Sequence, residues 1–273
     1  MRALNRSSWP VWIATSIAAA GIVYWHASPK LAYADRDFTT GYILLGLMLF
    51  LALYNGRKKL SMLPLGKAST WLTLHLAGGI FALVVFRLHV GSLWPIGPMH
   101  RALAALFYAV CVSGVVGYGL QLWLSRRLAQ AGGEIIFERI PAEIAAIRAQ
   151  AEKAVLKAAE ESGNDTLGRD YLQTLAWYFA QPRFFWSCAM GGFGRRSENW
   201  LQRNLHTIGR YLSDAERAHL NELSRLGSEK RRVDVQYAMQ SLLKRWTIFH
   251  VPLAAAMLTL AVWHLILVEV FAQ

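Results

Sequence analysis

The sequence contains few cysteines and few charged residues. Only two of its 273 residues are cysteines, Cys111 and Cys188, which excludes a disulfide scaffold and an iron–sulfur cluster held by cysteines. Charged residues make up 17% of the chain, below the roughly 25% that is usual for soluble domains. Aromatic residues make up 12%, which excludes a disordered chain. With 55% hydrophobic residues, the composition predicts a membrane protein with a modest soluble part.

Long hydrophobic runs are abundant. Five apolar segments approach or exceed the roughly 20 residues that a helix needs to cross the hydrocarbon of a bilayer. They are residues 9–25, 38–54, 70–89, 102–124 and 246–271. The first segment also has features of a signal peptide, but its apolar stretch is long and the candidate cleavage site lies far beyond it, so we favour a retained helix.

We therefore expect an all-α integral membrane bundle of about five transmembrane helices. Residues 1–124 form the first four helices, residues 125–245 form a helical insertion, and residues 246–273 form the fifth helix, which completes the bundle. In the insertion, residues 141–161 are rich in good helix formers, and residues 162–165 have turn chemistry. Ser213 and Glu216 have the spacing of a capping box that opens another helix.

Basic residues outnumber acidic ones by 29 to 17, and they gather beside particular apolar segments. By the positive-inside rule, this pattern predicts a cytoplasmic N-terminus, a cytoplasmic insertion and a C-terminus outside, in a membrane such as the bacterial inner membrane. A nucleic-acid binder would concentrate its basic surplus on a soluble face, so we expect no nucleic-acid partner. The flanking basic residues are Arg2, Arg6, Arg57, Lys58, Lys59, Lys67, Arg126, Arg127, Lys244 and Arg245.

Four of the eight histidines lie inside two of the expected spans. His75 and His89 are 14 residues apart in the third span, and His250 and His264 are 14 apart in the fifth. Fourteen residues at about 100° each place both histidines of a pair on the same side of a helix, about 21 Å apart along its axis. The positive-inside rule makes these two spans parallel. We therefore expect His75 at the depth of His250, and His89 at the depth of His264.

Two histidines that face one another across a bundle suit haem, whose iron takes axial ligands from both sides of the porphyrin. The spacing predicts two haem b groups, an inner one held by His75 and His250 and an outer one held by His89 and His264. A zinc or di-iron site would need clustered ligands, often carboxylates, and Glu269 is the only acidic residue in any expected span. The alternative is that these histidines only form hydrogen bonds between helices.

At this point the sequence resembles the two-haem b-type membrane cytochromes, the ferric reductase-like and cytochrome b561-like families. The similar parts are residues 71–75 through His89, and residues 249–252 through His264. The resemblance implies transmembrane electron transfer between two stacked haems. Ferric reductases usually have six core spans and a flavin and nicotinamide domain. This sequence has a long segment between its fourth and fifth spans instead, and no strand-flanked G-x-G-x-x-G motif.

Several other residues can be interpreted either as functional or as structural and interfacial. Arg87 is either a clamp for a propionate of the outer haem or a snorkelling interfacial residue. His26 and His100 either serve a quinone or an additional haem, or are interfacial residues, which we favour. Residues 177–200 are aromatic and basic, which is typical of a docking face for a redox partner, of a small helical core or of a segment lying on the membrane surface.

The sequence favours an electron carrier over an enzyme with its own nicotinamide or flavin site. Its expected partners are the lipid bilayer, a redox protein or quinone, and other subunits of a redox complex. One alternative is a non-redox scaffold or transporter whose histidines bond between helices. Another is a self-contained quinol dehydrogenase.

Overall fold

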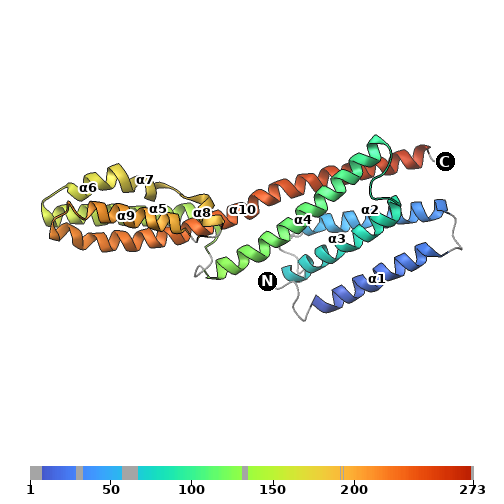
Figure 1. The fold of residues 1–273 in the computed structure, drawn as a ribbon, viewed down its shortest axis with the longest axis horizontal. Helices are drawn as coiled ribbons and strands as arrows, with labels where there is room; N and C mark the ends of the chain where they lie inside the picture. Colours follow the sequence, from blue (N-terminus) through green and yellow to red (C-terminus); the bar gives the residue numbers. More distant parts are fainter. Residues whose placement is uncertain are drawn as a thin grey trace. The chain divides into compact units, whose positions relative to one another are not determined.

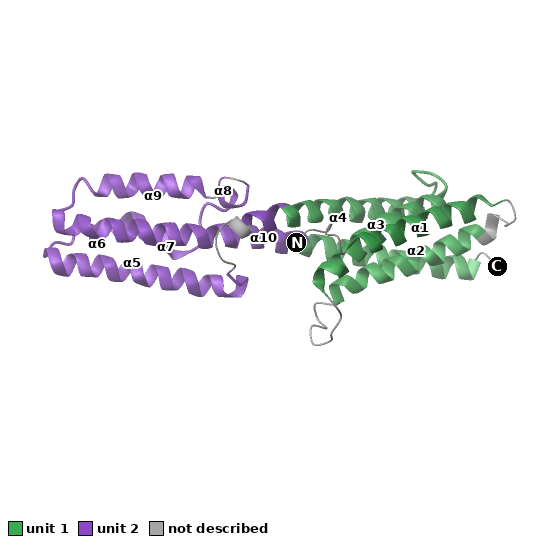
Figure 2. Ribbon diagram, turned by 90° about the horizontal axis from the view of Figure 1, so that it is seen from below, with its two compact units in different colours: residues 1–122, 247–273 green, residues 123–246 purple. Residues whose placement is uncertain are grey.

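The computed structural model describes residues 8–28, 33–56, 67–130, 135–190, 192 and 194–271. Within these residues the fold is all-helical and contains no strand. The chain divides into two compact units (Figure 2), one made of residues 1–122 and 247–273 and the other of residues 123–246. We call them unit 1 and unit 2 and describe each by itself.

Unit 1 contains the helices that are apolar enough to cross a membrane (Figure 1). It holds α1 (Trp9–Ala27), α2 (Tyr33–Gly56), α3 (Ala68–Val90), most of α4 (Pro98–Gln130) and the end of α10 (Asp214–Phe271). Among the described residues, four helices are long and apolar enough to span a bilayer, and they are α2 from Arg36, α3, α4 as far as Arg127, and α10. The chain is therefore an integral membrane protein.

The first expected span folds as helix α1 but is not among these four. Helix α1 has 19 residues, and Trp9, Trp12, Tyr24, Trp25 and His26 are among them. Its C-terminal end is tied to the start of α2, because the Arg36 guanidinium donates to the carbonyls of His26 at 3.0 Å and Ser28 at 2.5 Å. By its length and composition, α1 is therefore not shown to be a fifth membrane span.

The core of unit 1 lies where α2, α3, α4 and α10 meet. Phe86 of α3 and Phe107 of α4 stack face to face, with ring centroids 4.1 Å apart. Both rings are buried, in a cluster that also includes Leu44 and Met48 of α2 and Met257 of α10. Large apolar residues elsewhere on these helices remain exposed, as expected for side chains that face lipid.

Unit 2 is a helical bundle built from η2 (Phe137–Arg139), α5 (Ile140–Ser162), α6 (Thr166–Asp170), η3 (Tyr171–Leu175), α7 (Ala176–Ala180), α8 (Phe185–Ala189), α9 (Arg195–Ile208) and the first part of α10. The apolar faces of α5, α6 to α7, α9 and α10 form one buried core. Inside it, Lys230 donates to the Asp234 carboxylate at 2.6 Å and to the Gln181 carbonyl at 2.9 Å. Both charged side chains are fully buried. The bond from Lys230 to Gln181 joins α10 to the chain that follows α7.

The expected capping box is confirmed. The backbone N–H of Ser213 donates to the Glu216 carboxylate at 3.1 Å, and the backbone N–H of Glu216 donates to the Ser213 hydroxyl at 3.4 Å. Glu216 also accepts a bond from the backbone N–H of Leu167 in α6, so one carboxylate serves the first turns of two helices. The expected turn after α5 is also present, because Gly163 ends that helix in the left-handed conformation, at φ 64°.

The helix that starts at this capping box does not end within unit 2. We expected separate helices for the end of the insertion and the fifth span, whereas α10 continues unbroken over 58 residues. Residues 228–251 contain neither glycine nor proline. No helix-breaking residue therefore interrupts α10 between its polar half and its apolar half. Pro252 is accommodated inside α10, one turn into the apolar part.

Candidate cofactor site

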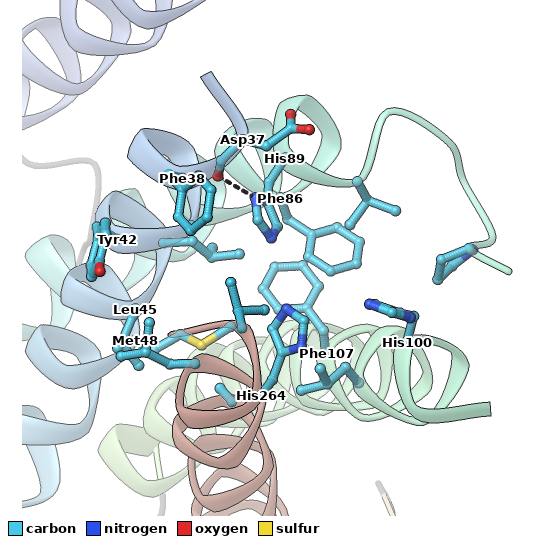
Figure 3. Close-up of a pocket in the computed structure, with 18 of the residues that line it drawn as sticks. Asp37, Phe38, Tyr42, Leu45, Met48, Phe86, His89, His100, Phe107 and His264 are labelled. Carbon is cyan, nitrogen blue, oxygen red and sulfur yellow. Dashed lines mark hydrogen bonds between the residues drawn. The ribbon is translucent and has the colours of Figure 1, made fainter. Parts of the chain in front are cut away.

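A cavity of about 400 Å³ lies among α2, α3, α4, α10 and the segment that joins α3 to α4. This volume is in the range of pockets that hold small molecules and cofactors. The lining is mostly apolar, and three histidines from three different helices reach it, namely His89, His100 and His264. In Figure 3, His89 enters the cavity from α3 and His264 from α10, with His100 of α4 to one side.

His89 is held in place by the start of α2. Its Nδ1 lies 3.0 Å from the Asp37 carbonyl and 3.2 Å from the Thr40 hydroxyl. The Thr40 hydroxyl donates to the Arg36 carbonyl at 2.8 Å, so both oxygens near Nδ1 are acceptors for the imidazole. The ring therefore carries its proton on Nδ1, and its lone pair lies on Nε2.

The tight fit between His89 and α2 depends on Gly41. A Cβ at this position would lie 3.0 Å from Cε1 of His89, closer than ordinary van der Waals contact. Because the ring is already held at Nδ1, a side chain at position 41 would displace it. Gly41 thus has a steric reason to be glycine, although its backbone is ordinary helix.

Two of the other three span histidines, His75 and His250, also form a hydrogen bond through Nδ1. Nδ1 of His75 in α3 lies 3.2 Å from the Leu51 carbonyl of α2. Nδ1 of His250 in α10 lies 2.6 Å from the Ser113 hydroxyl of α4, and that hydroxyl donates to the Val110 carbonyl at 2.9 Å. The Leu51 carbonyl can only accept, so His75 donates from Nδ1 and has its lone pair on Nε2. The Ser113 hydroxyl can act as donor or acceptor toward Nδ1 of His250.

The sequence spacing pairs His89 with His264 and His75 with His250. Of these, His89 and His264 line one cavity. The contact partner of the His264 ring is His100, with centroids 5.2 Å apart and ring planes at 80°.

The donor set is compatible with haem. A histidine that ligates a metal commonly donates its other ring N–H to a carbonyl or another acceptor, which fixes the tautomer and aims the ligating nitrogen. His75 and His89 have this arrangement, and Nδ1 of His250 forms a hydrogen bond with the Ser113 hydroxyl. The described residues include no group of three or more histidine, cysteine, aspartate or glutamate side chains able to hold an ion. A haem iron needs only two ligands from the protein, because the porphyrin supplies the others.

The remaining predicted residues lie elsewhere. Arg87 is exposed on α3 and does not line the cavity, which favours its interfacial interpretation. His26 is partly exposed at the end of α1. Cys111 is partly buried in α4, and burial raises the pKa of the Cys188 thiol in unit 2 to about 12, so that thiol is unreactive.

Several residues of this site escaped the sequence reasoning. The acceptors on Asp37 and Leu51 are backbone carbonyls, which any residue type provides. Tyr42, which also lines the cavity, donates a hydrogen bond to Glu269 and thereby joins α2 to α10. Glu269 carried a signal, because an acidic residue in a span usually needs a partner.

Together, the fold and the site define an integral membrane helical protein whose membrane helices carry several histidines, three of which line one cavity. Comparison of the chain with protein-family models, with curated proteins and with solved structures finds no match.

Proposed function

We propose that this protein is a di-haem b-type membrane cytochrome that passes electrons across the bilayer. His75 and His250 would hold one haem, and His89 and His264 the other. When bound, haem supplies one-electron oxidation and reduction. The observation that carries the proposal is the shared arrangement of His75, His89 and His250, whose Nδ1 atoms all form hydrogen bonds with a neighbouring helix.

The residues of the chain would orient the ligands, leave room for them and exclude water from the cavity. The Leu51 and Asp37 carbonyls and the Ser113 hydroxyl orient the rings, and hydrogen bonds of this kind make imidazole a stronger ligand. Gly41 leaves room for the His89 ring. The apolar lining of the cavity, including Phe86 and Phe107, excludes water, and burial of this kind tunes the reduction potential of a haem.

The topology proposed with this function follows from the basic residues. The N-terminus and unit 2 lie in the cytoplasm, the C-terminus lies outside, and α1 is a fifth span of a bacterial inner membrane. His75 and His250 then belong to the cytoplasmic side. Electrons pass between a cytoplasmic or quinone-pool partner and an acceptor on the opposite face, and the chain is one subunit of a redox complex. Reporter enzymes fused after Ser28 and after Phe271 test this orientation.

Purification from membranes, followed by a pyridine haemochrome assay, tests the haem content. We expect two b haems per chain, one fewer in His75→Ala, one fewer in His264→Ala, and none in the double variant. His206→Ala is the matched control, because His206 is exposed in unit 2. A colourless wild-type protein, or two haems retained in both single variants, contradicts the assignment.

One observation favours a non-redox membrane protein instead. The bonds of His75 to α2 and of His250 to α4 are also the interhelical hydrogen bonds that a scaffold or transporter would use. Haem content separates the two functions. A self-contained quinol dehydrogenase is favoured by His100, an exposed histidine on the cavity wall. Reduction of the haems by a quinol analogue, without a partner protein, is its test.

A further inference from the structure

Helix α8 presents an apolar surface at one end of unit 2. Trp186 and Met190 lie one turn apart, and their exposed fractions are 64% and 66%. The backbone N–H of Met190 donates to the Trp186 carbonyl, so the two side chains lie on the same side of this turn. The opposite side holds Cys188 and Ala189, which are fully buried. The exposed side chains are therefore not required to fill the core of unit 2.

Arginines surround this surface without acidic partners. Arg195 and Arg196 are exposed and lie next to α8, because the backbone N–H of Arg196 donates to the Ser187 hydroxyl. The Arg245 guanidinium lies over the Phe185 ring, 4.8 Å from its centroid. Among the described residues, these three arginines take part in no ion pair, whereas nearby Lys244 and Arg231 are paired with Glu138 and Glu198. Residues 181–197 contain no acidic residue.

The contact with Arg245 lies close in sequence to the apolar part of α10. Arg245 lies two residues before Thr247, where α10 enters unit 1. The Phe185 ring therefore contacts α10 at a residue close in sequence to the start of its apolar part. Basic and aromatic side chains beside an apolar segment are typical of the interface between water and lipid.

The start of α8 is also conformationally strained. Phe184 adopts the left-handed conformation, with φ 54° and ψ 39°, which a bulky residue rarely occupies. Arg183 lies over the Trp177 ring at 4.1 Å, and the Phe184 and Trp177 rings meet edge to face, which fixes the chain at this point. This backbone conformation starts α8 in the direction that exposes Trp186.

We propose that the surface formed by Trp186, Met190, Arg195, Arg196 and Arg245 is a docking site for the anionic lipid surface of the cytoplasmic leaflet. Trp186 and Met190 enter the headgroup layer, and the three arginines bind lipid phosphates. The choice of lipid over an acidic protein follows from the mixture of exposed apolar and unpaired basic side chains and from the contact of Phe185 with Arg245, which immediately precedes the apolar part of α10 in the sequence. The inference does not depend on haem.

Electron paramagnetic resonance on the full chain in lipid nanodiscs tests this proposal. A nitroxide is attached at Met190→Cys in a background with Cys111→Ala and Cys188→Ala, and circular dichroism checks that the background is folded. Should Cys188→Ala unfold unit 2, Cys188 can remain, because its buried thiol reacts slowly. The control label is at Tyr211→Cys, since Tyr211 is 75% exposed and lies before Asp214, about 45 Å along α10 from Arg245.

In nanodiscs that contain phosphatidylglycerol, we expect the label at position 190 to collide with oxygen and to be shielded from a water-soluble nickel chelate. The label at position 211 should remain accessible to the chelate. Replacing Arg195 and Arg196 by Gln should lower the membrane-bound population about fivefold per arginine, the factor expected for a basic side chain at an anionic surface. Pure phosphatidylcholine or high salt should have a similar effect.

Equal chelate accessibility at positions 190 and 211 in all lipids would overturn the proposal and leave this surface to an acidic protein partner. Shielding that is identical in phosphatidylcholine and phosphatidylglycerol would overturn the role of the arginines. Loss of haem in any of these variants is not expected. The result is thus independent of whether the proposed electron-transfer function is correct.

Discussion

Replacing Gly41 and Gly46 of α2 by alanine, one at a time, tests how tightly His89 is held. At Gly46 a new Cβ meets nothing within 4 Å, so alanine should stabilise the helix by about 0.5–1 kcal/mol. Alanine at Gly41 has the same effect on the backbone, but its Cβ lies 3.0 Å from Cε1 of His89. The ring can move away only by weakening the bond between Nδ1 and the Asp37 carbonyl, which costs about 0.5–1.5 kcal/mol.

The two variants should therefore differ by about 1 kcal/mol in their free energy of unfolding, with Gly46→Ala the more stable. Unfolding by sodium dodecyl sulfate in mixed micelles measures this difference in the protein with or without cofactor. If the proposed function is correct, Gly41→Ala should also shift the reduction potential of one haem and leave the other unchanged, whereas Gly46→Ala should shift neither. Equal stability of the two variants, together with unchanged potentials, would refute the reasoning that α2 clamps His89.

Three further predictions concern other parts of the molecule. Ser113→Ala removes the hydroxyl that bonds to Nδ1 of His250, so it should shift the potential of the haem that His75 and His250 would hold, whereas Thr259→Ala, on the exposed side of α10, should not. Burial alone would raise the pKa of the Glu216 carboxyl, but hydrogen bonds from Ser213 and Leu167 outweigh burial and lower this pKa. The ionised carboxylate therefore stabilises the folded state above about pH 4.3, the ordinary pKa of glutamate. This stabilisation is lost as the pH falls through the pKa of Glu216 in the folded state. Glu216→Gln should therefore weaken unit 2 by about 1 kcal/mol at neutral pH and flatten this loss, as measured by hydrogen exchange in α6 and α10; an unchanged acid profile would argue against the role of the carboxylate. Gly227→Ala puts a Cβ 2.0 Å from Cδ2 of Leu201 and should cost about 1–3 kcal/mol, which the double variant with Leu201→Ala should partly recover; a double variant less stable than the sum of the two single changes would contradict that packing argument.

The helical fold and the membrane helices could be predicted because they depend on local features of the sequence. Apolar runs of sufficient length identify α2, α3, α4 and the end of α10. The capping box of Ser213 and Glu216 and the left-handed Gly163 follow from the chemistry of single residues. The continuity of α10 could have been inferred from the lack of glycine and proline between Gly227 and Pro252, but the change from polar to apolar residues suggested a boundary that helix geometry does not need.

The surroundings of the histidines could not be predicted, because they depend on which backbone atoms tertiary packing places beside each ring. Nothing in the residue types of Asp37 and Leu51 indicates that their carbonyls accept bonds from His89 and His75. Gly41 is one of 21 glycines, and only the position of α3 beside α2 gives it a steric role. Sequence spacing can therefore indicate which histidines share a depth, whereas packing determines which nitrogen each ring offers.

That nitrogen bears on the choice between the two functions. A histidine that only joins two helices needs one polar contact, and either ring nitrogen can make it. A ligand must be anchored through one nitrogen and offer the other, and anchoring at Nδ1, the nitrogen nearer the backbone, directs Nε2 away from the helix that carries it. His75, His89 and His250 all use Nδ1, although their acceptors come from different parts of α2 and α4. If each ring could equally well use either nitrogen, three independent bonds would agree on Nδ1 about one time in eight. This agreement favours haem ligation over simple helix joining. Two adjacent residues of α2 contribute to it at His89, because Gly41 leaves room for the ring and the Thr40 hydroxyl contacts its Nδ1.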